Sequence, residues 1–126
     1  MGIGRWIIKH SPGGPKSVAK TMHRAFLQGK NSGMTRDSAL RFSISSRYMI
    51  NRIADQKTID SFIEESDSLA TLVFLCVGLE NRAACEFPFM ESTVEDIHEF
   101  FLDNDPSEIG SFSQLLEIVK TGKKLR

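Results

Sequence analysis

The sequence predicts an all-α protein, folded as a single compact domain of five or six helices that spans residues 1–126. Apolar residues recur at helical spacing along most of the chain. Capping residues and glycines mark where these segments begin and end. With 40% hydrophobic and 25% charged residues, a chain of this length can bury a core without disulfides or metal ions.

The first long helix is expected to follow an N-terminal arm, residues 1–14. Within this arm the short apolar segment Trp6–Ile8 is either a strand or a docked extension, and Ser11–Gly14 forms a loop. Pro15 suits a first helical position, and Gly29 can close the helix. The apolar side chains between them share about a third of the helix circumference. They are Val18, Ala19, Met22, Ala25 and Phe26.

Two further helices are expected before residue 69. One begins after Thr35, whose hydroxyl can cap it, and runs towards Ile53. A break near Ser45 and a continuous rod are both compatible with its serine-rich middle. The other is short, carries the apolar stripe of Ile59–Ile63, and is interrupted or capped again near Ser68.

The segment 69–80 is apolar on all sides, which is typical of a buried central helix. A strand that turns at Glu80 and Asn81 and pairs with the following residues is the alternative. It would give an α+β fold with a small β-hairpin near 69–89. Glu-Asn is a poor two-residue turn, so we expect the helix.

Two capping boxes predict the last two helices. The first pairs Ser92 with Glu95, and its helix ends at the acidic, proline-containing stretch that follows. The second pairs Ser111 with Gln114. A glycine stop and a basic tail, residues 122–126, close the chain.

The sequence also predicts a compartment. Only three apolar residues separate Arg5 from Lys9, which is too few for a signal peptide. The longest apolar run, Leu72–Val77, is too short to span a membrane. The two cysteines form neither a disulfide framework nor a zinc spacing. We therefore expect a soluble, cytoplasmic protein that has no contact with membranes.

Charge is the one unusual feature of the chain. The net charge is zero, yet residues up to Lys57 include 11 basic and 2 acidic side chains, and the remainder include 5 basic and 14 acidic ones. Helical spacing gathers a basic face on the first long helix and an acidic face on the fifth, each opposite the apolar stripe. The basic face consists of Lys16, Lys20, His23, Arg24 and Lys30, and the acidic face of Glu95, Asp96, Glu99 and Asp103.

Three interpretations of these faces are open. Each can be a solvated surface whose sign is incidental, because surface ion pairs contribute only about 0 to 1 kcal/mol. The two faces can pair, within one subunit or between subunits. Alternatively, the basic face stays free to bind nucleic acid or another polyanion.

The sequence contains no motif complete enough to name a reaction or a ligand. The loop before the first helix lacks the glycine that a nucleotide-binding loop needs before its Lys-Ser pair, because Pro15 stands there. Gly13 and Gly14, together with Lys16, remain candidates for holding one anion at the helix N-terminus. No second Glu-x-x-His pair accompanies the one that ends at His98, and no catalytic set is evident. We expect neither a metal nor a cofactor.

The sequence therefore favours a non-enzymatic protein-interaction or regulatory module. Its partner is a protein or a second copy of the chain, bound through the charged faces. The alternative function is binding of nucleic acid or another polyanion through the basic face of the first helix.

Overall fold

The computed structural model describes residues 14–47, 55–81, 86 and 88–122. This part of the chain contains six α-helices and one 3-10 turn, and no strand, so the predicted all-α fold is confirmed. The predicted arm, except for Gly14, and the tail beyond Gly122 lie outside it. The helices are α2 (Pro15–Asn31), α3 (Arg36–Arg47), α4 (Gln56–Glu65), α5 (Leu69–Glu80), α6 (Met90–Asn104) and α7 (Phe112–Thr121), with the turn η2 (Pro106–Glu108) between the last two.

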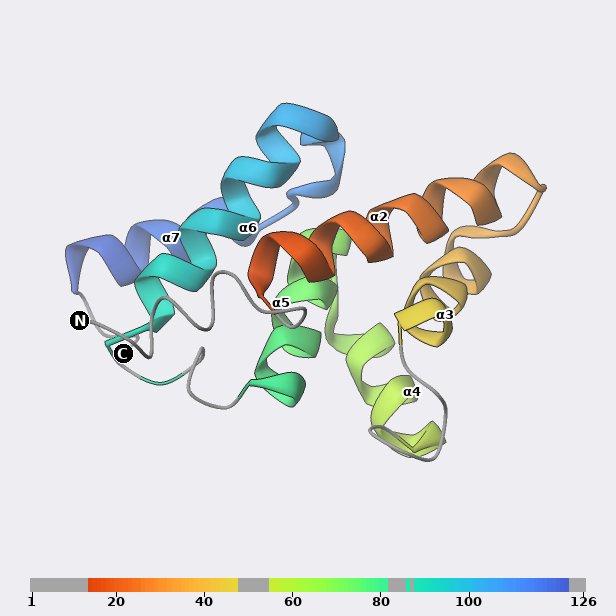
Figure 1. Ribbon diagram of the computed structural model, residues 1–126, viewed down its shortest axis with the longest axis horizontal. Coiled ribbons are helices and arrows are strands. Elements are labelled where there is room, and N and C mark those ends of the chain that lie inside the picture. The colour runs from red at the N-terminus through yellow and green to blue at the C-terminus, as the bar shows by residue number, and fades with distance from the viewer. Residues whose placement is uncertain (1–13, 48–54, 82–85, 87, 123–126) are drawn as a thin grey trace.

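The helices surround one hydrophobic core (Figure 1). The long helix α2 packs against α3, α5 and α6, whereas α7 lies along α6 and α4 lies against α3 and α5. Each large core side chain that is fully buried stabilises the fold by about 1.5 to 3 kcal/mol relative to exposure. The largest come from five of the six helices: Met22, Ile44, Leu69, Leu72, Ile97, Phe101 and Phe112.

Helix α5 is the central element that the apolar segment predicted. Its N-cap is Ser68, whose hydroxyl accepts a hydrogen bond from the N–H of Thr71 at 3.3 Å. Its apolar sides are covered by α2, α4 and α6, which all contact it. The alternative β-hairpin over 69–89 is wrong, since residues 69–80 form helical hydrogen bonds. None of the described helices is both long and apolar enough to cross a membrane.

Several predicted helix ends are confirmed. Pro15 is the first residue of α2, and the hydroxyl of Thr35 accepts a hydrogen bond from the N–H of Ser38 at 3.1 Å, just before α3. Gly122 follows α7 in the left-handed conformation. Helix α3 continues through Ser45 to its last described residue, so no break occurs there, and its predicted extension over 48–53 lies outside the described residues.

Both predicted capping boxes are wrong in detail. Helix α6 begins at Met90, which packs against the core, so its N-cap is Phe89, three residues before Ser92. Ser111 does stand at the N-cap of α7, but its side chain makes no capping bond. Its backbone N–H donates instead to the carboxylate of Asp67, at 3.0 Å.

The link between α6 and α7 docks on the start of α5. The carboxylate of Glu108 accepts two hydrogen bonds from the guanidinium of Arg36, at 2.5 and 2.9 Å, and one from the N–H of Leu69, at 2.8 Å. We call these three residues the Glu108 junction. Beside it, the hydroxyl of Ser68 donates to the carbonyl of Ile109 at 2.9 Å. Residues from α3, α5 and η2 are thereby fixed together.

Replacing Gly110 tests how closely this link approaches α5. Gly110 has φ +56°, and a Cβ there would lie 2.8 Å from the Cβ of Ser68. We expect Gly110→Ala to lower the free energy of unfolding by about 2 to 4 kcal/mol, because a clash adds to backbone strain. Gly122→Ala, where φ is +71° and no atom lies within 4 Å, should cost about 1 kcal/mol. Equal costs in urea titrations would contradict the close approach.

Asp67 gives the fold an acid-sensitive contact. Hydrogen bonds from Ser111, with others from Thr71 and Ser68, hold the pKa of Asp67 below its ordinary value. Such a carboxylate stabilises the folded state above its unfolded-state pKa, and that stability is lost as pH falls through the folded-state pKa. We therefore expect Asp67→Asn to be less stable than the natural chain at pH 7, with a smaller further loss between about pH 5 and 2. Parallel stability curves for the two proteins would refute this.

Candidate functional site

The fold brings part of the predicted basic face against part of the predicted acidic face. Helices α2 and α6 pack together, and the ammonium of Lys16 pairs with the carboxylate of Glu99. This hydrogen bond, with the nearby charges of Asp96 and Asp103, raises the pKa of Lys16. The second interpretation of the charged faces, in which they pair within one subunit, therefore holds for this part of each face.

The side chain of His23 is largely buried, although helical spacing predicted it on the exposed basic face. Its Nε2 lies 3.1 Å from Oδ2 of Asp105, the C-cap residue that follows α6. Its ring also meets Phe100 and Phe101 edge-on, with centroids 5.7 and 5.8 Å apart. Its side chain is only 12% exposed. His23 thus fixes α2 to the end of α6 and is not available to a partner.

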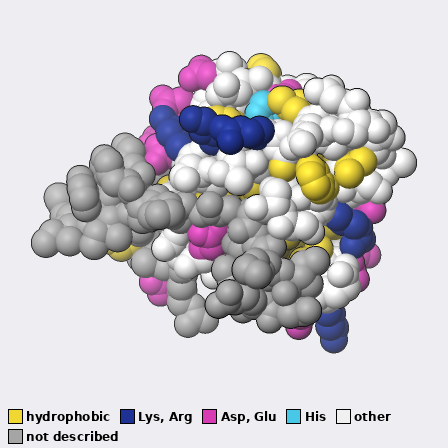
Figure 2. Space-filling model, turned by 45° about the vertical axis from the view of Figure 1, so that its right-hand side comes forward, with side chains coloured by type: hydrophobic (Ala, Val, Ile, Leu, Met, Phe, Trp, Pro, Cys, Tyr) yellow, Lys and Arg dark blue, Asp and Glu magenta, His cyan; other side chains and the backbone are white. Residues whose placement is uncertain are grey.

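The rest of the basic face remains on the surface of α2. Lys20, Arg24 and Lys30 are exposed, and no carboxylate of the described residues pairs with any of them. Leu27 lies among them with 40% of its surface exposed. We call these four residues the basic strip. Figure 2 shows Lys and Arg side chains on this side of the molecule, directly beside Asp and Glu side chains.

The acidic face forms one side of an open groove of about 460 Å³ along α6 and α7. Two leucines, Leu102 and Leu116, line it, and Leu102 is 52% exposed. Lys16 stands on one side, and Lys120 stands on the other, with its ammonium 3.7 Å from the carboxylate of Glu95. We call this the acidic groove. All four predicted acidic residues line it: Glu95, Asp96, Glu99 and Asp103. The prediction that all four are exposed is wrong for Asp96, which is buried because it faces the packed side of α6, with 9% of its surface exposed.

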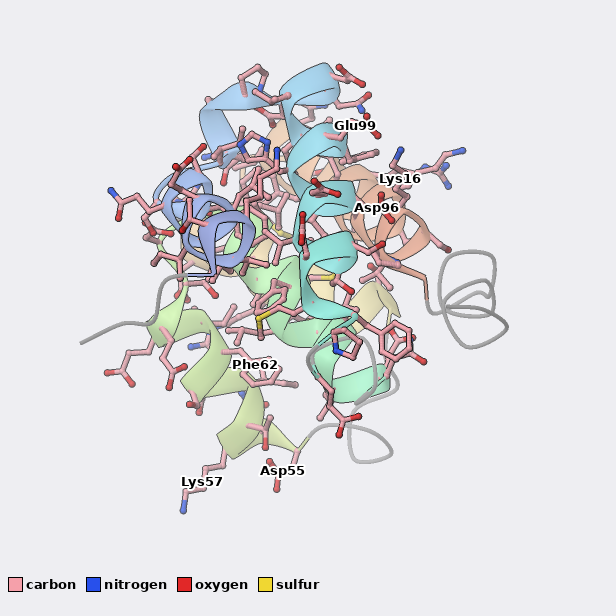
Figure 3. All side chains as sticks on the ribbon, turned by 90° about the vertical axis from the view of Figure 1, so that its left-hand side faces the viewer. Lys16, Asp55, Lys57, Phe62, Asp96 and Glu99 are labelled. Carbon is pink, nitrogen blue, oxygen red and sulfur yellow. The ribbon has the colours of Figure 1, made fainter. Side chains whose placement is uncertain are left out.

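Figure 3 shows how the groove is built at the boundary with α2. Lys16 reaches out from α2 towards the outer side of α6, where Asp96 and Glu99 stand on successive turns. Lys57 projects from α4 at the opposite end of the molecule. Exposed carboxylates lie at that end too, among them Asp55, which Figure 3 labels beside Lys57. Apart from the buried Asp96, the groove presents the carboxylates of Glu95, Glu99 and Asp103, and two of these pair with Lys120 and Lys16.

The groove also holds a contact that sequence spacing did not reveal. Nε2 of His98 lies 2.9 Å from the hydroxyl of Ser113, and the His98 ring stacks on Phe112. An imidazole beside a hydroxyl can begin a nucleophilic pair, but that chemistry needs a third group to orient the imidazole. Among the described residues no carboxylate bonds to His98. The pair therefore links α6 to α7.

The candidate anion site is only partly within the described residues. Gly14 is the N-cap of α2, and Gly13 lies outside the described part of the chain. Lys16 points to Glu99 and is thus engaged away from the helix N-terminus. Over the described residues no group of three or more His, Cys, Asp and Glu side chains is placed to hold a metal.

Comparisons with known proteins do not indicate a function for this chain. No family model, no curated protein and no solved structure matches this chain. The features that remain are the basic strip and the acidic groove, which lie on the adjoining helices α2 and α6.

If the groove serves binding, its carboxylates should be dispensable for folding. We expect Glu99→Gln, which removes an exposed ion pair, to change the free energy of unfolding by less than about 1 kcal/mol. The matched change Glu108→Gln should cost about 2 to 3 kcal/mol, because that carboxylate is 7% exposed and accepts three hydrogen bonds. Thermal and urea unfolding measure both. A larger cost for Glu99→Gln would assign the groove a structural role.

Proposed function

We propose that this chain is a non-enzymatic protein-interaction module of the cytoplasm, which binds its partner through the acidic groove. One observation carries this proposal. An open groove of about 460 Å³ combines the carboxylates of Glu95, Glu99 and Asp103 with Leu102, the more exposed of the two large hydrophobic side chains that stand out from the described surface. Charge directs the encounter with a partner, and apolar contact supports affinity.

The chain's own lysines indicate what the groove accepts. Lys16 and Lys120 stand at its two sides, and each places its ammonium against a groove carboxylate. These pairs are exposed and therefore weak, so cationic side chains of a partner can replace them. Leu102 and Leu116 provide apolar contact between the charges. A cationic segment that also carries apolar residues is thus the chemistry that fits.

Polyanion binding is a second candidate because Lys20, Arg24 and Lys30 are exposed without a described carboxylate partner. Three cations release few counterions, so their contribution to phosphate binding is small and sensitive to salt. The acidic groove adjoins them, and its carboxylates repel phosphates. The geometry therefore favours a protein partner.

The proposal can be tested with a fluorescein-labelled amphipathic peptide of lysine, leucine and alanine, measured by fluorescence polarisation. We expect the peptide to bind, and the double variant Glu99→Gln with Asp103→Asn to weaken binding about tenfold, which corresponds to about 1.4 kcal/mol. The matched variant Glu64→Gln with Glu65→Gln, on the exposed side of α4, should bind the peptide as the natural chain does.

Two results would overturn this function. One is equal loss of peptide binding in the groove variant and the α4 variant, which would mean attraction by total charge alone. The other is tight binding of a labelled oligonucleotide at about 50 mM salt that fades at about 200 mM and disappears in Lys20→Glu with Arg24→Glu. That pattern would assign the chain to polyanion binding.

A further inference from the structure

The basic strip and the acidic groove form one continuous surface. Lys16 joins them, since it extends from α2, which carries the strip, and also lines the groove. On one side of the pair between Lys16 and Glu99, the exposed charges of α2 are positive. On the other side, those of α6 are predominantly negative. Figure 2 shows the two signs side by side.

We infer that a second copy of this chain binds to this surface, and that the two copies form a two-fold symmetric dimer. This inference rests on the proposed function and names the partner. In a two-fold interface each protomer offers the same patch, so the patch must be complementary to itself. A surface with a positive half and a negative half meets that condition when the axis passes near Lys16 and Glu99. The strip of each protomer then lies on the groove of the other.

The apolar side chains support the same arrangement. Leu27 and Leu102 are the large hydrophobic side chains that stand exposed on the described part of the molecule, at 40% and 52%. Leu27 belongs to the strip, and Leu102 lines the groove. Pairing strip with groove therefore brings both leucines into the interface at two symmetric places. Burial of apolar area is the general source of stability in association.

Other occupants satisfy only half of the surface. A cationic protein segment fits the groove and leaves the strip without a partner, whereas a polyanion fits the strip and is repelled by the groove. A second copy offers Lys20 and Arg24 to the groove and its own carboxylates to the strip in one contact. A second copy is therefore the occupant that matches both the positive strip and the negative groove.

A charge-swap experiment tests the dimer with the full chain. The strip variant is Lys20→Glu with Arg24→Glu, and the groove variant is Glu99→Lys with Asp103→Lys. In sedimentation equilibrium at about 50 mM salt the natural chain should be a dimer, and its dissociation constant should rise at least about tenfold at about 500 mM. Each variant alone should be a monomer, because both halves of its surface then carry the same sign.

An equimolar mixture of the two variants should restore the dimer. In the mixed pair, the acidic strip of one protomer meets the basic groove of the other, and the converse contact is equally attractive. Loss of folding does not explain such a rescue, since two misfolded chains would not recover a defined heterodimer. The control Glu64→Lys with Glu65→Lys changes the total charge as the groove variant does, but on α4, and should remain a dimer.

Three outcomes would overturn the inference: a natural chain that is monomeric at low salt, open-ended assembly in place of a dimer, or a mixture of variants that stays monomeric. A monomeric chain that still binds the lysine-leucine peptide through the groove would retain the interaction module and exclude only the second copy as its partner. Loss of both peptide binding and the dimer would remove the proposed function as well.

Discussion

The carboxylate of Glu108 is the contact on which the arrangement of the helices depends. It joins Arg36 at the start of α3 to Leu69 at the start of α5, and it belongs to the turn between α6 and α7. A buried carboxylate is costly unless it is paired, and here a bidentate guanidinium and the N-terminus of a helix both stabilise its charge. The same bond raises the pKa of Arg36. Because the junction ties the α2–α3 pair to the α6–α7 pair, it helps to set α2 beside α6.

This arrangement decides how the charges of the two halves of the chain meet. Ion pairs such as Lys16 with Glu99 and Arg36 with Glu108 each join a residue before position 57 to one after it. The contact of His23 with Asp105 does the same. The folded molecule therefore does not have one positive end and one negative end. Opposite charges neutralise each other where the helices meet, and exposed charge remains elsewhere, as at Lys20 and Arg24 on α2 and at Glu64 on α4.

Sequence periodicity could predict the helices because the information is local. The stripe of apolar residues from Val18 to Phe26, the cap at Thr35 and the glycine stop after α7 all act within a few residues. The start of α6 was missed because Met90 packs into the core, and that tertiary contact overrides the capping box at Ser92. Burial of a side chain against distant helices leaves no signal at the local spacing that capping rules use.

The sequence could also predict which residues share each charged face, but not which of them stay exposed to a partner. All four acidic residues do lie together, because helical geometry alone places them on one side of α6. Which basic residues remain exposed depends on the partners of α2. His23 contacts Asp105, which lies 82 residues further along the chain. Lys16 pairs with Glu99, which lies 83 residues further along. No spacing rule reaches that far, so the division of the basic face into paired and exposed members required the fold.

The zero net charge of the chain fits a surface that recognises itself. A dedicated polyanion binder needs an excess of positive charge, since its field must attract phosphates from a distance. Two copies of a neutral chain have no net charge to repel each other at long range, so the local pattern decides how they meet. With Lys20 and Arg24 on one half of the face and Glu99 on the other, the orientation of lowest repulsion is the one that turns the second copy by half a revolution. A positive half and a negative half on one surface, on a chain without net charge, thus suit contact between two copies related by a two-fold axis.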